Sequence, residues 1–209
     1  MLKIFGSLIR YNQDKRILDL GCGSGAFLRY LTEFNVPLLG IDLCFNLVAT
    51  AKKKIDHVKF IVGDAEYLPL PDESVDIIVF SGFLHHLPNM EKVIKEAYRV
   101  LRKGGRCFAY DPNSRNPIMQ LYRNKHSLFY SDKGRTPNER LLTAEELFDT
   151  FTRAAFKVDV FAISGLSYKY IEDKKIAIFL PIYNTIDYLL SMMPLSRRYG
   201  SFLITLAKK

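Results

Sequence analysis

The sequence predicts a single α/β domain whose doubly wound parallel sheet is covered by helices on both faces. Two observations carry this prediction. Short apolar runs alternate with stretches of helical periodicity, and several of the runs stop at glycine or aspartate. Repeated strand–helix units form parallel sheets because right-handed crossovers return each strand beside another. With 48% hydrophobic and 25% charged residues, the 209-residue chain suits one globular domain.

The expected elements follow from these patterns in chain order. Unbroken apolar runs predict buried strands, and apolar residues at helical spacing predict amphipathic helices. Asn89 is a candidate helix cap, Gly104-Gly105 is expected to close that helix, and Thr143 begins a capping box. We therefore expect strands at 16–20, 36–42, 58–62, 75–81, 106–111, 157–163 and 200–207, with helices at 24–34, 45–55, after Asn89, and at 143–155.

The formal net charge of +8 is unevenly distributed. Residues 1–112 carry 15 basic and 13 acidic groups, a net of +2, whereas 113–140 and 165–209 each carry a net of +4. A basic surface permits nucleic acid, an anionic membrane or an acidic substrate as partner. The two basic segments are therefore of most interest for recognition, and 113–140 also lacks a clear period, which is typical of a functional connection.

The cysteines, the first ten residues and the most apolar stretch indicate where in the cell the protein is expected. The three cysteines are widely spaced and lack the spacing of metal ligands, which favours a reduced, cytoplasmic setting without a metal. Residues 1–10 do not fit a signal peptide. The most apolar stretch, 176–193, contains Pro181, Asn184 and Asp187, so a transmembrane span is not expected there. We expect this stretch to belong to the core or to a lid, with an apolar wall of the substrate site or a peripheral membrane contact as the alternatives.

Glycines and acids gather where the predicted strands end. Gly21-Cys-Gly-Ser-Gly25 follows the first strand, while Asp42 and Asp64 follow the second and third. Ligands of open α/β sheets bind at the carboxyl ends of the strands. The GxGxG spacing and the nearby Asp19 count against a dinucleotide. A cofactor with a ribose, an adenine and a positive centre fits these acids better.

Five segments follow one another in a characteristic order: 17–25 (ILDLGCGSG), 40–42 (GID), 63–76 (GDAEYLPLPDESVD), 81–88 (SGFLHHLP) and 98–105 (YRVLRKGG). Together they resemble class I S-adenosylmethionine-dependent methyltransferases of the methyltransferase-11 type, which act on small molecules. The resemblance implies a Rossmann-like, three-layer α/β/α fold with seven strands, mostly parallel with an antiparallel last strand. It implies S-adenosyl-L-methionine as cofactor, S-adenosyl-L-homocysteine as product, and a cofactor-binding core at 16–111.

The resemblance also assigns cofactor contacts residue by residue. Asp19 would lie near the methionine amino group, and Asp42 would hold the ribose hydroxyls. Asp64 would accept from the adenine amino group, with Leu43 against the ring. The remaining cofactor contacts, expected mainly through the backbone, are Gly21, Cys22, Gly23, Gly25, Ala65 and Ser81.

Two histidines and a polar set are candidates for acting on the methyl acceptor. His85 and His86 lie just past the fourth strand, and either could be a general base if the acceptor is a hydroxyl. Local packing is the competing interpretation for both. The expected substrate contacts are Asp111, Asn113, Arg115, Tyr122, Arg123, His126 and Tyr130.

The function predicted from these residues is methyl transfer to a small-molecule or lipid-like acceptor, with a negatively charged acceptor as one option. Residues 113–140 and 164–196 are expected to cover the substrate within a single domain, 1–209. The Asn/Asp-Pro-Pro-Tyr/Phe sequence typical of methylation of a ring-attached amine in DNA or RNA is absent after the fourth strand, where Ser81-Gly82-Phe83 stands instead. An RNA methyltransferase that uses the basic second half, and a non-catalytic partner protein that binds the same cofactor, remain as alternatives.

Overall fold

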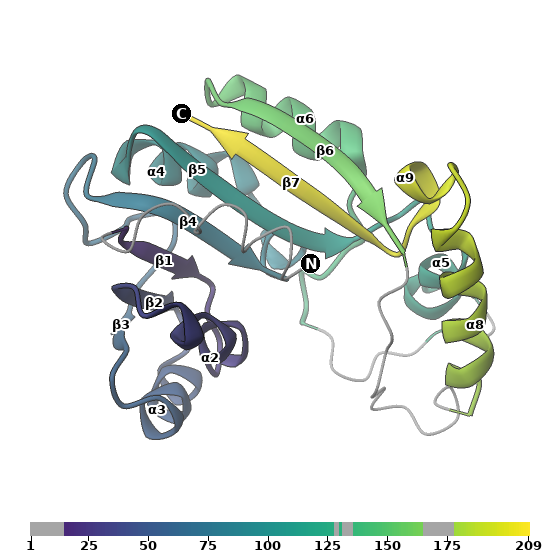
Figure 1. The fold of residues 1–209 in the computed structure, drawn as a ribbon, viewed down its shortest axis with the longest axis horizontal. Helices are drawn as coiled ribbons and strands as arrows, with labels where there is room; N and C mark the ends of the chain where they lie inside the picture. The colour runs from purple at the N-terminus through teal and green to yellow at the C-terminus, as the bar shows by residue number, and fades with distance from the viewer. Residues whose placement is uncertain (1–14, 128–129, 131–135, 165–177) are drawn as a thin grey trace.

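The computed structural model describes residues 15–127, 130, 136–164 and 178–209, with only the backbone of Tyr122. A seven-stranded sheet in the order β3-β2-β1-β4-β5-β7-β6 forms its centre (Figure 1). The strands are β1 (Ile17–Leu20), β2 (Leu38–Asp42), β3 (Lys59–Val62), β4 (Val75–Ser81), β5 (Leu101–Pro112), β6 (Lys157–Ile163) and β7 (Phe202–Lys208).

The strand directions confirm the predicted fold class. β1 pairs in parallel with β2 and β4, β2 with β3, and β4 with β5. The last strand, β7, runs antiparallel to both of its neighbours, β5 and β6. The chain order reverses between β1 and β4, and in sheets of this kind ligands bind at such a point.

Helices bury both faces of the sheet, which gives the three layers. Along β4, Ile78 and Phe80 enter one hydrophobic core, and Ile77 and Val79 enter the other. This alternation is dictated by the period of two along a strand. One core receives apolar side chains from α4 (Met90–Val100) and α6 (Ala144–Arg153). The opposite core receives them from α2 (Ala26–Leu31) and α3 (Phe45–Lys54).

The predicted helix caps are present, with one boundary corrected. Asn89 accepts a hydrogen bond from the Glu91 backbone, and Thr143 accepts one from Glu146. The sequence predicted that the helix after Asn89 continues to Gly104-Gly105, but the helix is shorter. It ends at Val100, because Leu101 already pairs with Val75 and opens β5.

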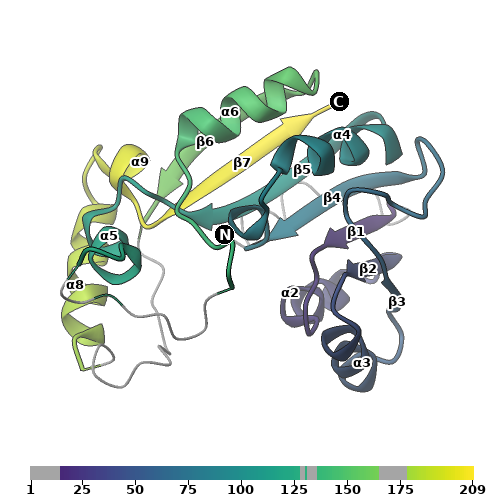
Figure 2. The same cartoon turned by 180° about the vertical axis from the view of Figure 1, so that it is seen from behind.

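Further short helices lie in the second half of the chain, where the apolar residues of 181–193 had helical spacing but 113–140 showed no clear period. In the 113–140 segment, α5 (Pro117–Arg123) begins at Asn116, whose side chain accepts from two backbone amides of its first turn. Before β7, α8 (Leu180–Ser191) and α9 (Ser196–Tyr199) lie at the same end of the molecule as α5 (Figure 2). Two 3-10 helices, η1 (Thr32–Phe34) and η2 (Leu84–His86), complete the described elements. Within the described ranges, no helix is long and apolar enough to cross a membrane.

Candidate functional site

The ends of four parallel strands bring the predicted glycines and acids to one edge of the sheet. Register places Leu20 beside Ile41 and Asp42 beside Val62, so the segments after β1, β2 and β3 leave the sheet together. Asp19 lies beside Val79 of β4. The sequence positions that had been grouped by motif are therefore grouped in space.

The loop after β1 uses its glycines for conformation and for close packing. Gly21, Gly23 and Gly25 all have positive φ values, of 75°, 52° and 79°, which side chains disfavour. A Cβ at Gly21 would lie 2.1 Å from the Phe83 ring, whereas one at Gly23 would meet nothing within 4 Å. The loop is thus packed at its first glycine and open at its second, where a ligand can approach the backbone.

Asp42 is held rigidly by the main chain around it. Its Oδ2 accepts from the Gly23 amide at 2.8 Å and its Oδ1 from the Cys44 amide at 2.9 Å. Each carboxylate oxygen keeps a further lone pair that can accept from a ligand hydroxyl. The neighbouring Leu43 is 71% exposed. An apolar side chain displayed beside a fixed carboxylate suits a ligand with a sugar and a flat ring.

Asp19 is a buried carboxylate that has no partner in the described protein. It is completely buried, and neither of its oxygens accepts a hydrogen bond from the described residues. Burial raises its pKa to about 7, and the charge of Asp42 adds to the rise; the polar Ser81 side chain nearby opposes it. A buried carboxylate of this kind is costly unless a cationic group pairs with it. Asp19 is therefore suited to hold a ligand ammonium.

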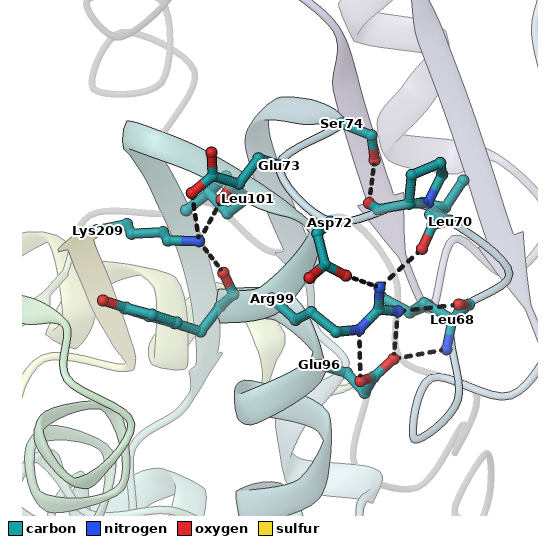
Figure 3. A network of polar contacts seen from close by, with 11 residues as sticks. Leu68, Leu70, Asp72, Glu73, Ser74, Glu96, Arg99, Leu101 and Lys209 are labelled. Carbon is teal, nitrogen blue, oxygen red and sulfur yellow. Dashed lines mark hydrogen bonds and ion pairs between the residues drawn. The ribbon is translucent and has the colours of Figure 1, made fainter.

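The loop after β3 carries Asp64 and is clamped by an arginine of α4. Asp64 is exposed, and its Oδ1 accepts from the Glu66 amide at 2.9 Å. Downstream, Arg99 donates to the carbonyls of Leu68 at 3.1 Å and Leu70 at 2.9 Å (Figure 3). Arg99 also forms ion pairs with Glu96 at 2.8 Å and Asp72 at 2.7 Å. Within the YRVLRKGG motif, this arginine fixes the path of the loop that follows Asp64.

The other predicted cofactor residues lie along the same edge. Ala65 is half-buried beside Asp64, and Ser81 is half-buried at the end of β4. Cys22 is buried, and burial raises the pKa of its thiol, so it is an unreactive filler of the loop.

His85 and Asp111 form a buried pair that joins η2 to β5. His85 Nδ1 lies 2.8 Å from Asp111 Oδ1, and the His85 amide donates to the same oxygen at 3.1 Å. Burial raises the pKa of the Asp111 carboxyl, and the hydrogen bond with His85 opposes that rise. With Nδ1 engaged, Nε2 is the ring nitrogen left for a ligand. Asp111 is buried and holds His85 through these contacts, and its predicted contact with substrate stays a prediction.

His86 belongs to a different cluster, formed with the 113–140 segment. Its Nδ1 lies 2.7 Å from Thr136 Oγ1 and 3.9 Å from Glu139 Oε2. Arg123 Nη1 pairs with Glu139 Oε1 at 3.3 Å. Burial is the main reason that the pKa of His86 falls to about 4, assisted by His85 and Arg123. His86 is therefore neutral near pH 7 and a weak base, which favours His85 for proton transfer.

His85, His86 and Glu139 are spaced like the ligands of a metal ion, but the positive charge of Arg123 lies beside them. Ligand-type atoms of His85, His86 and Glu139 lie within 4.8 Å of one another. Arg123 is paired with Glu139 there, and its fixed positive charge opposes a second cation. That no metal is used stays a prediction.

The remaining predicted substrate residues differ in where they lie. Asn113 is buried, and its amide donates to the carbonyls of Arg198 and Gly200 at 3.1 and 2.7 Å. These contacts tie Asn113 to the chain before β7, and its predicted substrate contact stays a prediction. Arg115 pairs with Glu145 at 2.9 Å, His126 is exposed, and Tyr130 is half-buried. The side chain of Tyr122 lies outside the described residues.

Three functional candidates were missed by sequence reasoning. The first is Tyr110, whose ring lies near Gly82. A Cβ on that glycine would lie 3.6 Å from the Tyr110 ring and 3.8 Å from the His85 ring. Burial, then Asp19 and Asp111, raise the pKa of Tyr110 to about 12, so its hydroxyl stays protonated. Thr136 and Glu139 meet His86 from a segment without periodicity. Only the place of Tyr110, next to Asp111 at the end of a predicted strand, was a signal in the sequence.

Comparison with known proteins agrees with this geometry. Residues 18–109 match the family model described as a methyltransferase domain. The match covers 92 of the 209 residues, and over these residues the chain is similar to methyltransferase domains. A methyltransferase structure from Methanosarcina mazei superposes with a TM-score of 0.68 at 21% identity, covering 99% of this chain and 96% of that one. At that identity the likeness shows the fold alone.

Two characterised relatives are enzymes that are longer than this chain. The sterol 4-C-methyltransferase of Caenorhabditis elegans is 27% identical over 133 residues, which are 59% of this chain and 40% of the relative. The 2-methyl-6-phytyl-1,4-hydroquinone methyltransferase of Spinacia oleracea is 31% identical over 151 residues, 70% of this chain and 40% of the relative. The chain thus spans less than half the length of either.

The methyltransferase domain implies S-adenosylmethionine as its cofactor, and the residues present fit that molecule. Its ammonium matches the unpartnered, buried Asp19. Its ribose hydroxyls match the fixed Asp42 carboxylate, and its adenine matches the exposed Leu43 with Asp64 nearby. The open backbone at Gly23 leaves room for close approach.

Proposed function

We propose that the protein transfers a methyl group from S-adenosylmethionine to a small-molecule or lipid-like acceptor. The observation that carries this proposal is the arrangement of two buried features on adjacent strands. Asp19 on β1 is a buried carboxylate without a partner among the described residues, and the His85–Asp111 pair joins η2, which follows β4, to the end of β5. The first suits a cationic cofactor, and the second suits an acceptor that must lose a proton.

In the proposed mechanism, the chain binds, aligns and removes a proton. Bound S-adenosylmethionine supplies an electrophilic methyl group on a positively charged sulfur. Asp19 and Asp42 hold opposite parts of the cofactor, and the loop of Gly21 to Gly25 follows its contour. Asp111 keeps the Nδ1 proton of His85 in place, so Nε2 can take a proton from an acceptor hydroxyl. Alignment and exclusion of water account for much of the expected acceleration.

The cover over the histidines favours a small acceptor. Thr136 and Glu139 contact His86, and the Arg140 amide donates to the His85 carbonyl at 3.0 Å. The segment around these residues thus folds back onto η2 and narrows the approach to the histidines. Such a cover suits a small molecule or a single chain of a lipid better than a folded RNA. The sterol and phytyl-hydroquinone relatives are named for acceptors of this apolar kind.

Incubation with methyl-labelled S-adenosylmethionine and fractionated cell extract tests this proposal. We expect label in the lipid or small-molecule fraction and none in RNA. Asp42→Ala is the matched control, because it should weaken cofactor binding about thirtyfold and lower labelling accordingly when the cofactor is below saturation. Label that enters RNA would favour the alternative that the protein is an RNA methyltransferase. Cofactor binding without any labelling would favour the alternative that it is a non-catalytic partner protein.

A further inference from the structure

One helix of the second half displays a continuous apolar face. Ile178, Ile182, Ile186, Leu189 and Met193 recur at intervals of three or four residues on and beside α8, and we call them the apolar stripe. Each is 48–73% exposed. Residues at this spacing lie on one side of a helix. Four further exposed apolar residues flank the stripe: Phe179, Tyr188, Met192 and Leu195.

The opposite side of α8 fixes the helix to the sheet, so the direction of the stripe is determined. Asp187 is 2% exposed and accepts a hydrogen bond from Ser201, just before β7. Tyr183 Oη lies 3.1 Å from Ser201 Oγ. These contacts use the polar side chains of the helix for anchoring. The apolar stripe is thereby held away from the domain core.

Charge around the stripe points to an anionic surface. From residue 174 to residue 209 the only acidic residue is Asp187, which is buried. Arg197 and Arg198 follow the stripe on α9 and are exposed. Their guanidinium groups lie over the rings of Phe161 and Tyr199, at 5.3 and 5.5 Å. Neither forms an ion pair with a carboxylate in the part of the chain that the structure describes.

We propose that α8 docks the protein on a bilayer containing anionic phospholipid, with the apolar stripe among the acyl chains and Arg197 and Arg198 at the phosphates. The 12 residues of α8 span roughly 18 Å, well short of the ~30 Å needed to cross the hydrocarbon. The helix would therefore lie in the plane of the interface. Tyr188, which is exposed beside the stripe, suits the boundary between headgroups and chains.

This placement would bring the α8 and α5 end of the molecule to the bilayer, at the end of the sheet where β5 reaches Pro112 (Figure 1). The surface is independent of the proposed function, since membrane docking and methyl transfer are measured separately. A lipid acceptor would gain from it by partitioning in the same bilayer.

Vesicle flotation of the full chain tests the proposal. We expect the protein to float with vesicles of phosphatidylcholine and phosphatidylglycerol, and weakly with phosphatidylcholine alone. Ile182→Ser with Ile186→Ser should reduce binding at least about tenfold, because both apolar anchors are lost. Arg197→Gln with Arg198→Gln should remove the preference for the anionic vesicles and abolish the salt dependence.

Phe148→Ser is the matched control, because Phe148 is similarly exposed, at 46%, but lies on α6. It should float like the wild type. Circular dichroism and S-adenosylhomocysteine binding should be unchanged in every variant, which separates loss of docking from loss of folding. The proposal is overturned if the wild type does not float, if Phe148→Ser fails equally, or if the protein is a dimer in solution that the stripe variants convert to monomers.

Discussion

The two halves of the sheet differ in how they hold their functional side chains. At the ends of β2 and β3, Asp42 and Asp64 are fixed by backbone amides of residues close to them in the chain or in the neighbouring loop. Past β4, His85 and His86 are fixed by side chains 26 and 50 residues away. A cofactor site built from local backbone is thus joined to an acceptor site built from distant contacts. We expect changes in the first half to affect cofactor affinity, and changes in the second to affect turnover.

The strongest test of this division is His85→Asn. Loss of the base that Asp111 orients should lower kcat about a thousandfold for a hydroxyl acceptor. The dissociation constant for S-adenosylhomocysteine, measured by calorimetry, should stay within about twofold, because the cofactor carboxylates are untouched. His86→Asn is the control, and should cost less than about tenfold. Equal loss of affinity and turnover in His85→Asn would make the residue structural.

Asp42→Ala should have the next largest effect, on the other half. Two hydrogen bonds from the ribose to a carboxylate are lost, so cofactor affinity should fall about thirtyfold. Titration calorimetry measures this directly. Asp72→Ala removes a carboxylate from the nearby clamp and should change affinity far less. An unchanged dissociation constant in Asp42→Ala would refute the proposed ribose contact.

Asp19 should make cofactor affinity depend on pH. The cofactor ammonium favours the ionised carboxylate, so affinity should fall about tenfold per pH unit as the pH drops below about 7 and level off above it. Calorimetry across this range tests the slope. Asp19→Asn should remove the slope and leave weak binding at every pH. A slope that persists in Asp19→Asn would assign it to another group.

The Asp19 carboxyl should also make the stability of the cofactor-free protein depend on pH, but stability should fall as the pH rises, whereas cofactor affinity should increase. Its folded pKa is raised, so its stabilising contribution is fully present below the unfolded pKa of about 3.8 and is lost as the pH rises through about 7. Asp19→Asn should therefore raise Tm relative to the wild type above pH 7 and change it little at pH 4. Thermal unfolding at the two pH values checks this, and a lower Tm for Asp19→Asn at high pH would contradict it.

The smallest effect is expected from Arg99→Leu. This change removes the clamp on the loop that follows Asp64, and should weaken cofactor binding about threefold through loss of loop order. Arg99→Lys keeps the charge but not the forked geometry, so its cofactor affinity should lie between those of Arg99→Leu and the wild type. Calorimetry and hydrogen exchange over residues 63–72 measure the two consequences. Faster exchange without any loss of affinity would separate the loop from the cofactor.

Much of the fold was predictable, because buried apolar residues recur at the regular spacing of a strand or a helix within a short stretch of sequence. The apolar runs of β1 and β4 gave their strands within one residue, and Asn89 and Thr143 were recognisable as caps. The start of β5 was wrong, because the pairing of Leu101 with Val75 overrides a glycine signal. α5 went unrecognised, since its seven residues are too few to establish a period.

Sequence alone determined the place of Asp19, Asp42 and Asp64, because each lies within or directly after an apolar strand that carries it to the same edge. Only the tertiary structure decided that Asp111 orients His85, that Thr136 and Glu139 engage His86, and that Asn113 holds the chain before β7. The physical reason is distance along the chain. Periodicity reports which way a backbone segment turns its side chains, whereas the choice of partner depends on how remote loops close upon one another.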